Sequence, residues 1–370
     1  KTLEEIDNTQ TKHCDDLAIK IYKILALTNS GSFKEALDYC NSNINDETEK
    51  YLLQYIINRT VNRNEQAISA LQKLAKIQSR PIVPKGFIEN NFDFRSLDIG
   101  DSSNRENSQA TQPLISVIMT VHRWNDAFPI AVNSILNQSH NNLELIIVDD
   151  GSNREDVEKY DLILTDKRIV RLRLETNSGT YACRNRGIGI ARGKYVTFAD
   201  SDDWNHPDRL KDSVQMIEQR NVDVVMGRFL RMDLQGNIQF NGSKISQFCL
   251  VGIMIKKAVI EKYNLKFDSR ARYSADSEFY ERIVLILGRN RVLRHEKIDI
   301  IALHHSHSLT GGGENRIDWI GPRSNRLRYV ADYRKAHKRI GSNHKFNFDE
   351  FQAPGEKTLV PKSNYAVSKL

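Results

Sequence analysis

The N-terminal part of the chain has a helical pattern of hydrophobic residues. Between about residues 15 and 78, apolar side chains recur three and four positions apart, as at Ile21, Ile24 and Leu25. This spacing is typical of amphipathic helices and predicts four short ones. Ala36 and Ala67 hold equivalent places in two similar segments 31 residues apart, which approaches the period of tetratricopeptide-like helical hairpins. The segment is therefore either a small bundle packed on the next domain or a hairpin array that binds a partner.

A different pattern begins after residues 81–113, a polar stretch that contains three prolines and that we interpret as a linker. Residues 114–121 are a continuous run of mainly apolar, β-branched side chains, as expected for a strand buried on both faces of a parallel sheet. Strand-like and helix-like segments then alternate four times, up to about residue 200. The alternation predicts an α/β domain with a doubly wound, mostly parallel sheet flanked by helices.

The length of 370 residues allows about two or three domains. Besides the linker we expect an α-helical domain at 1–80, the α/β domain at 114–310, and a C-terminal extension at 311–370. Lys1 stands where an initiator Met would be, and whether the sequence is a trimmed one is left open.

The positive charge of the chain is concentrated in one segment. The formal net charge is +7, and residues 289–340 alone contain twelve basic and five acidic side chains. Residues 322–340 predict a basic helix with Pro322 in its first turn. Its expected inner stripe consists of Leu327, Val330, Arg334 and His337.

Three interpretations of this basic helix are open. It could contact anionic lipid as a peripheral membrane element, since each basic residue near such a surface contributes about 1 kcal/mol. It could contact an acidic polysaccharide or the diphosphate of a ligand, or it could be an ordinary docked helix with a solvated face. Nucleic-acid binding is not expected, because the segment follows no known motif and has few interleaved aromatic residues.

The sequence predicts neither a membrane span nor a disulfide framework. No apolar run approaches the roughly 18 residues of a spanning helix, and the first residues have no signal-peptide core. The four cysteines are scattered without a CxxC pair. We therefore expect a cytoplasmic protein, with peripheral contact to the inner face of the membrane left open.

Polar side chains follow each predicted strand of the α/β domain. Thr120 ends the first strand, Asp149 and Asp150 end the second, and the acidic segment 200–203 ends the fourth. Ligands of such sheets bind beyond the carboxyl ends of the strands. Several carboxylates gathered there would repel one another, which indicates a divalent cation between them. Mg²⁺ prefers oxygen ligands, whereas Mn²⁺ also accepts imidazole.

The motifs at these strand ends are similar to those of a known family. Their sequences are Ser116-Val-Ile-Met-Thr, Val148-Asp-Asp-Gly-Ser, Arg184-Asn-Arg-Gly-Ile and Asp200-Ser-Asp-Asp-Trp. In order and spacing they resemble the family 2 glycosyltransferases of the GT-A fold, including bacterial capsular and surface polysaccharide transferases. The resemblance covers roughly half the chain, becoming weaker towards residue 310.

The resemblance implies a binding site for a nucleotide sugar, such as a UDP-sugar. Thr120 and Asp150 match positions that hold the nucleobase and ribose, and Asp150 would accept a hydrogen bond from uracil. Asp200 and Asp202 match the Asp-x-Asp motif, in which the first carboxylate faces the ribose and the second binds the metal. Asp203 would support the metal shell or meet the donor sugar.

Arg184 and Asn185 lie in the helix predicted at 181–191, before the fourth strand. They fall in the segment that approaches the donor. Whether Arg184 contacts phosphate or braces Asp200 is open at this point. The nearby glycines at 187, 189 and 193 have GxGxxxG spacing inside a predicted helix, which excludes a dinucleotide fingerprint and a Rossmann dehydrogenase.

A second acidic segment resembles the family's Glu-Asp-x-Glu-Phe motif. It places Asp276 as the general base that removes the acceptor proton in an inverting transfer. Only part of the motif is matched, because Ala275 stands where relatives often have Glu. Asp276 could instead cap the helix that passes through Phe279, or do both.

The histidine cluster at 304–307 resembles the family's His-x-x-Ser-Leu-Ser segment, and aligning Ser308 selects His305 as a metal ligand. The expected cofactor is Mn²⁺ or Mg²⁺. A zinc site made of these histidines alone is less favoured, because no fourth ligand lies at a recognised spacing; solvated loop histidines remain the plain alternative. The glycine-rich segment after residue 310 suits a lid.

The function implied is metal-dependent, inverting transfer of a sugar from a nucleotide diphosphate to a hydroxyl of a growing surface or capsular glycan. Two alternatives stay open. One is a nucleotidyltransferase or nucleotide-sugar hydrolase that uses the same metal site. The other is a catalytically silent GT-A scaffold, although a binding module has no need of a base such as Asp276.

Overall fold

The computed structural model describes residues 16–98, 112–240, 244–271, 273–304, 317–318, 321–322 and 324–340. Contacts divide the chain into two compact units. The first unit contains Lys1–Gly100, Arg228–Gln247 and Glu296–Pro322, and the second contains Asp101–Gly227, Phe248–His295 and Arg323–Leu370. The boundaries expected near residues 80, 113 and 310 stay predictions.

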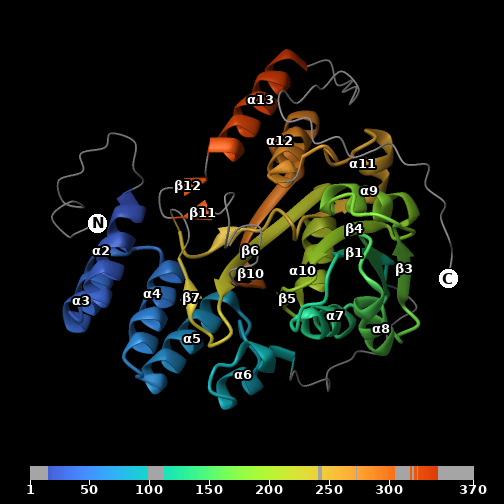
Figure 1. Ribbon diagram of the computed structural model, residues 1–370. Coiled ribbons are helices and arrows are strands. Elements are labelled where there is room, and N and C mark those ends of the chain that lie inside the picture. Colours follow the sequence, from blue (N-terminus) through green and yellow to red (C-terminus); the bar gives the residue numbers. More distant parts are fainter. Residues whose placement is uncertain are drawn as a thin grey trace. The chain divides into compact units, whose positions relative to one another are not determined.

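Four helices occupy the segment in which four were predicted (Figure 1, blue). They are α2 (Asp16–Asn29), α3 (Phe33–Asn43), α4 (Glu47–Thr60) and α5 (Asn64–Gln78). They contact one another as the hairpins α2–α3 and α4–α5. Ala36 and Ala67 are each the fourth residue of the second helix of a hairpin, and both are fully buried. Their equivalence in sequence is thus an equivalence of position in the hairpin.

The segment interpreted as a linker contains further structure. It includes α6 (Lys85–Glu89) and the short 3₁₀ helix η1 (Phe94–Asp98). Phe87 and Phe92 are buried and pack edge to face, with ring centroids 5.7 Å apart. The backbone of Gly236 approaches this cluster so closely that a Cβ there would lie 2.3 Å from the Phe92 carbonyl oxygen. Only glycine fits at that position, where φ is also +76°.

Buried polar contacts join the helices of the first unit to segments far along the chain. Glu49, fully buried in α4, accepts hydrogen bonds from the N–H groups of Ile245 and Ser246 at 2.7 and 3.1 Å and from the Ser246 hydroxyl at 2.6 Å. Burial raises the pKa of Glu49, while these three donors oppose the rise. Arg80 forms a buried ion pair with Asp299 at 2.6 Å. Such groups are buried only where partners satisfy them, so these contacts specify how the unit closes.

The second unit is built on the predicted parallel strands. They are β1 (Ile115–Val121), β2 (Leu143–Asp149), β3 (Ile169–Arg173) and β4 (Tyr195–Asp200). Strand β1 pairs in parallel with both β2 and β4, and β2 pairs in parallel with β3. The connecting helices are α7 (Phe128–Leu136), α8 (Arg154–Ile163) and α9 (Thr180–Ile190).

Strand β9 (Met254–Lys256) then adds antiparallel to β4, and β6 (Val224–Met232) adds antiparallel to β9. The full strand order is β3-β2-β1-β4-β9-β6-β10-β5. The remaining elements are β5 (Trp204–Asn205), α10 (Arg209–Gln219), β7 (Ile238–Gln239), β8 (Gln247–Phe248), α11 (Lys257–Lys262), α12 (Ala275–Leu287), η3 (Arg289–Arg291), β10 (Val292–Leu303), β11 (Ile317–Asp318), β12 (Gly321–Pro322) and α13 (Ser324–Ile340).

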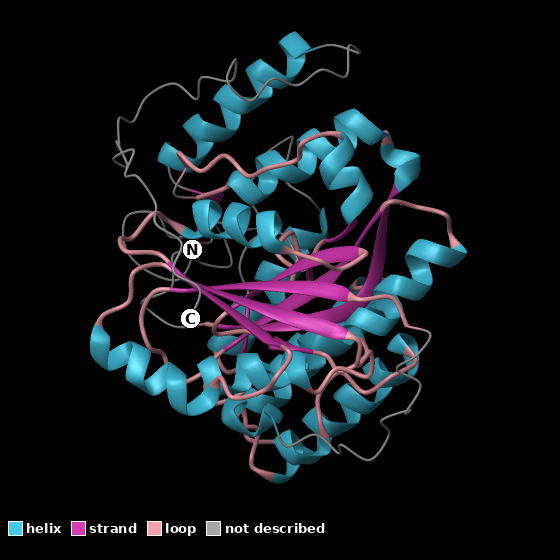
Figure 2. Cartoon of the chain, turned by 90° about the vertical axis from the view of Figure 1, so that its right-hand side faces the viewer, coloured by secondary structure: helices cyan, strands magenta, loops and turns pink. Residues whose placement is uncertain are grey.

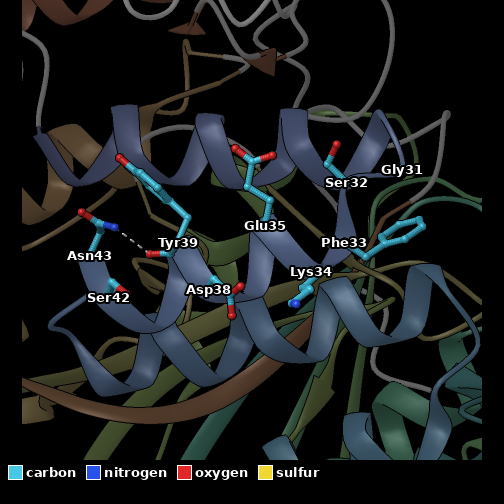
Figure 3. Close-up of a pocket in the computed structure, with 9 residues that line it drawn as sticks. All are labelled: Gly31, Ser32, Phe33, Lys34, Glu35, Asp38, Tyr39, Ser42 and Asn43. Carbon is cyan, nitrogen blue, oxygen red and sulfur yellow. Dashed lines mark hydrogen bonds between the residues drawn. The ribbon is translucent and has the colours of Figure 1, made fainter.

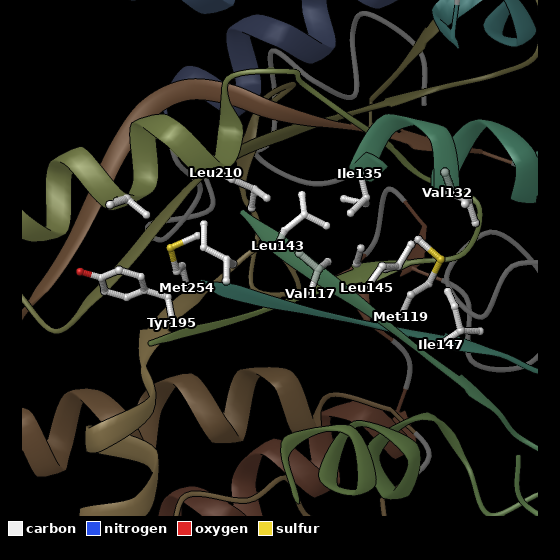
Figure 4. Close-up of a cluster of buried hydrophobic side chains, with 14 of the residues drawn as sticks. Val117, Met119, Val132, Ile135, Leu143, Leu145, Ile147, Tyr195, Leu210 and Met254 are labelled. Atoms are coloured by element: carbon white, nitrogen blue, oxygen red, sulfur yellow. The ribbon is translucent and has the colours of Figure 1, made fainter. Parts of the chain in front are cut away.

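Both faces of the parallel strands are apolar, and helices cover both faces (Figure 2). Val117 and Met119 of β1 belong to one cluster, which includes residues of α7 and α10 (Figure 4). Ile118, between them, belongs to the other cluster, which includes residues of α9 and α12. Alternate side chains thus point to opposite buried faces, which explains why the strand sequences are continuously hydrophobic.

One detail of the predicted basic helix is wrong. Pro322 lies in β12, and α13 begins at Ser324, so proline does not occupy the first turn.

Candidate active site

The sheet topology brings the polar strand ends together. The chain passes from β1 to β2 and β3 on one side and returns to β4 on the other side of β1. The carboxyl ends of β1 and β4 therefore form the topological switch point at which open α/β sheets bind ligands. In the strand register Thr120 lies beside Val148 of β2 and Asp200 of β4. Three of the predicted site segments thus share one edge.

Asp150, the first residue after β2, is buried and holds the loop that leads into α9. Its carboxylate accepts hydrogen bonds from the N–H groups of Ser178 at 2.6 Å and Gly179 at 2.8 Å. Gly151 follows with φ of +73°, and a Cβ there would lie 2.9 Å from the carbonyl carbon of Thr176. The Asp-Asp-Gly-Ser sequence therefore builds a tight turn against this loop, and Asp150 closes it.

Thr120 also faces the start of α9. Its hydroxyl lies 2.9 Å from the hydroxyl of Thr180. On the same side, His122 Nδ1 lies 2.9 Å from the carbonyl oxygen of Asp150. Side chains and backbone from the ends of β1 and β2 are therefore tied to each other around this part of the switch point.

Arg184 braces Asp200. The guanidinium is 4% exposed, and its Nη2 donates to Asp200 Oδ1 at 2.7 Å. The guanidinium also lies over the rings of Tyr181, Phe198 and Phe267, with its central carbon 5.5–5.8 Å from their centroids. Its Nε is buried, with no hydrogen-bond acceptor in reach among the described residues. The ion pair with Asp200 is thus present.

The pKa of Asp200 responds to burial and to the charged groups around it. Burial raises the pKa of Asp200, and the neighbouring carboxylates of Asp202 and Asp276 add to the rise even though Arg184 opposes it. Burial lowers the pKa of Arg184, but the charges of Asp200, Tyr181 and Asp276 and the hydrogen bond to Asp200 together outweigh it, and the net shift is upward. Asp203, the next acid, is buried as well.

Asn185, the residue after Arg184, is engaged with the protein backbone. Its side chain accepts from the N–H of Phe267 at 2.8 Å and donates to the carbonyl of the same residue at 2.9 Å. The pair of hydrogen bonds fixes the Phe267 segment against α9, which is a contact between residues 82 positions apart.

Asp276 lies at the second position of α12. Ser274 is the N-cap residue of this helix and has φ of +62°, so the alternative in which Asp276 caps the helix is wrong. The Tyr181 hydroxyl donates to Asp276 Oδ1 at 3.3 Å. Tyr181 is therefore in contact with the predicted base and, through its ring, with Arg184. A non-glycine residue in the left-handed region two positions before Asp276 is the kind of local strain that clusters at functional sites.

The predicted metal ligands are only partly described. His305 lies outside the described residues. Within the described part of the chain, no three His, Cys, Asp or Glu side chains are grouped so as to hold a metal ion. Two neighbouring aspartates nevertheless suit a hard cation, because Mg²⁺ is usually held by one or two carboxylates together with substrate phosphates.

Comparison with known proteins assigns the family. The model of glycosyl transferase family 2 matches residues 116–302, which is half of the chain. This chain belongs to glycosyl transferase family 2. The match spans the parallel strands and α12, so the expected GT-A fold, with helices N-terminal to it, is confirmed.

Several relatives share the matched region. A 126-residue stretch is 39% identical to an uncharacterized glycosyltransferase of Haemophilus influenzae, covering 34% of this chain and 50% of that protein. Glycosyltransferase GlyG of Streptococcus pneumoniae is 31% identical over 161 residues, covering 43% and 53%. TuaG of Bacillus subtilis, whose name refers to teichuronic acid biosynthesis, is 39% identical over 113 residues, covering 30% and 44%. The chain spans about half the length of the curated relatives it matches.

The family 2 chain also has a likeness among solved structures. S. aureus TarS 1-349 in complex with UDP-GlcNAc is 20% identical, with a TM-score of 0.44, covering 52% of this chain and 59% of that one.

The basic helix of this family member is docked on the helix that carries Asp276. Tyr333 and His337 of α13 are buried. The Tyr333 hydroxyl donates to Glu281 Oε1 at 3.0 Å, and His337 Nε2 lies 3.0 Å from Oε1 of the buried Glu278. Arg334 forms an ion pair with Glu281 at 2.6 Å. The stripe predicted from sequence included Arg334 and His337 but missed Tyr333.

Two contact residues of the site were not selected from the sequence. Tyr181 precedes Arg184 by three positions in a predicted helix, and this spacing would have placed both on one face. Phe267 carried no local signal, because its place depends on Asn185, far away in sequence.

A depression elsewhere in this family 2 chain lies along α3, with a volume of about 640 Å³ (Figure 3). It is lined by Gly31, Ser32, Phe33, Lys34, Glu35, Asp38, Tyr39, Ser42 and Asn43. Its residues come from one helix and the turn before it, and it is open, so it does not compete with the switch point as the active site.

Within the described part of the chain, no helix is long and apolar enough to cross a bilayer.

Proposed function

We propose that this chain is a metal-dependent, inverting glycosyltransferase. It would transfer a hexosyl unit from a UDP-sugar to a hydroxyl of a growing surface or capsular glycan. One observation carries the proposal. Asp200, at the end of β4, and Asp276, at the start of α12, belong to one connected set of contacts through Arg184 and Tyr181. A donor-side carboxylate and a candidate base are thus held at the same switch point.

The donor nucleotide would bind at the ends of β1, β2 and β4. Thr120 and Asp150 would hold the nucleobase and ribose, and Asp200 would face the ribose. The Asp150 carboxylate accepts two N–H groups in the protein, and its two oxygens offer about four acceptor sites, so it can also accept from a donor on uracil. Arg184 would serve the donor by bracing Asp200, and Asn185 would act indirectly, by holding the Phe267 segment.

The metal would be held by Asp202, together with His305 and the donor diphosphate, with Asp203 supporting it. Mn²⁺ or Mg²⁺ bound there would stabilise negative charge on the departing nucleotide.

In the transfer itself, Asp276 would take the proton of the acceptor hydroxyl. The hydroxyl oxygen forms a bond to the anomeric carbon from the face opposite the nucleotide, the bond from that carbon to the diphosphate oxygen breaks, and UDP leaves with the electron pair. Configuration at the anomeric carbon is thereby inverted. A positioned base of this kind contributes typically about 10²- to 10⁴-fold to the rate.

A panel of nucleotide sugars tests this proposal. A bound ligand raises thermal stability by mass action, so we expect one UDP-sugar to raise the melting temperature in Mn²⁺ and not in EDTA. The same donor should release UDP faster when the correct glycan acceptor is present. Stabilisation by no nucleotide sugar, with or without metal, would support the silent-scaffold alternative. Acceptor-independent cleavage would support the hydrolase, and transfer of the nucleotidyl group would support the nucleotidyltransferase.

The acceptor class rests on the relatives. TuaG, which matches the α/β region, carries a name that refers to synthesis of a cell-surface polymer. We therefore place the acceptor among bacterial surface glycans, and the site of action at the cytoplasmic side where such chains grow.

Peripheral membrane contact through α13 is a further part of the proposal. Lys335 and Lys338 are exposed on α13, whereas Arg334 is used in docking. Replacing both lysines by Gln should weaken partition to phosphatidylserine vesicles about 30-fold, since each basic residue contributes about 1 kcal/mol. The control is the same change at Lys159 and Lys167, around α8. Unchanged sedimentation with vesicles would leave α13 as a docked helix only.

A further inference from the structure

Among the described residues, the Tyr181 side chain contacts both the Arg184 guanidinium and Asp276. It lies in the first turn of α9 and is 6% exposed. Its hydroxyl is 3.3 Å from Asp276 Oδ1, and its ring is 5.6 Å from the central guanidinium carbon of Arg184. A buried hydroxyl aimed at a carboxylate restricts where that carboxylate can lie.

A column of stacked aromatic rings fixes the position of Tyr181 relative to α12. Its ring stacks on Phe267 at 5.7 Å, and Phe267 stacks on Phe279 at 4.1 Å. Phe279 follows Asp276 by three positions, so both lie on one face of α12. Asn185 fixes the middle ring by its two hydrogen bonds to the Phe267 backbone. The distance between the hydroxyl and Asp276 is therefore set by packing between two helices.

The phenol is suited to donate. Burial, and next to it the charge of Asp276, raises the pKa of Tyr181 above its ordinary value. The hydroxyl consequently keeps its proton over the range in which a carboxylate base works. A hydrogen bond to a charged group is stronger than one between neutral groups, and it favours one orientation of the acceptor.

We propose that Tyr181 is a positioning residue for the transfer step. The stacked rings of Phe267 and Phe279 fix the place of its hydroxyl, and the hydroxyl orients the Asp276 carboxylate towards the acceptor hydroxyl. This inference rests on the proposed function, in which Asp276 is the base. Under this inference the neighbouring residues Arg184 and Tyr181 have different roles. Arg184 serves the donor side through Asp200, and Tyr181 serves the acceptor side through Asp276.

The test is Tyr181→Phe, which keeps the stacked ring and removes only the hydroxyl. We expect kcat for transfer to fall by about 10- to 100-fold, the rate equivalent of one hydrogen bond to a charged group. The affinity for UDP-sugar in Mn²⁺, measured by calorimetry, should change by less than about twofold. In the background of Asp276→Asn the same change should have no further effect, because the hydroxyl acts through that carboxylate.

Tyr195→Phe is the matched control. It also removes a tyrosine–carboxylate hydrogen bond, the one to Glu218 at 3.0 Å, but from the first residue of β4, whereas Asp200 is the last. It should lose stability without losing kcat. Tyr181→Phe with wild-type kcat, or with donor affinity lost in step with kcat, would overturn the inference.

The two proposals fail separately. If Asp276→Asn is fully active, the base assignment itself is wrong. If Asp276→Asn is inactive while Tyr181→Phe is as active as the unaltered chain, only the positioning role is wrong.

Discussion

Asp276→Asn should bind the donor normally and transfer almost no sugar. The amide has nearly the shape of the carboxylate but cannot take the acceptor proton, so we expect the transfer rate to fall by about 10²- to 10⁴-fold. Asp276 lies in the first turn of α12 without being its cap, so the substitution should leave the helix start intact. Single-turnover transfer assays, combined with calorimetric UDP binding in Mn²⁺, measure the two quantities independently.

Glu281→Gln provides the control on the same helix. It removes a carboxylate that pairs with Arg334 and Tyr333 of α13, so it tests whether any loss of charge on α12 impairs the enzyme. We expect a change in stability and little change in transfer rate. Equal losses in the two variants, or full activity of Asp276→Asn, would contradict the assignment of Asp276 as base.

Asp202→Ala should remove the metal-dependent part of donor binding. Asp202 lies two residues beyond Asp200, and its carboxylate adds to the rise in the pKa of Asp200. Without it, UDP affinity in Mn²⁺ should fall to the value in EDTA, and transfer should fall by at least about 10²-fold, as when one group that stabilises transition-state charge is lost. Titrating UDP with and without Mn²⁺ gives the metal dependence directly.

Asp161→Ala, on the exposed surface of α8, is the matched loss of an aspartate away from the site, where Asp161 pairs with Arg171. Its metal dependence should equal that of the unaltered chain. If Asp202→Ala also keeps the full difference between Mn²⁺ and EDTA, the metal is held elsewhere.

The parallel core could be predicted from sequence because its signal is local. β1, β2 and β4 are buried on both faces, so their sequences are continuous hydrophobic runs, and polar residues such as Thr120, Asp150 and Asp200 mark where each run ends. Since parallel strands end at a common edge, clustering of these residues followed from the fold class.

The side-chain contacts that decide the roles of individual residues were harder to predict from the sequence. Whether Arg184 braced Asp200 was open, because an ion pair between a helix and a strand end depends on side-chain direction. Asn185 was assigned to the donor, and its hydrogen bonds to Phe267 depend on a segment 82 residues away. Docking of α13 through Tyr333 was missed because tyrosine is polar at one end and apolar in its ring.

The buried carboxylate of Glu49 links the fold to the order in which the chain is made. Its partners, Ile245 and Ser246, are 196 and 197 residues further along. At about 5–20 residues per second a ribosome needs roughly 10–40 s to make that stretch. Throughout that interval α4 exists without the groups that satisfy Glu49, so the N-terminal helices reach their final packing only after most of the α/β region has been synthesised.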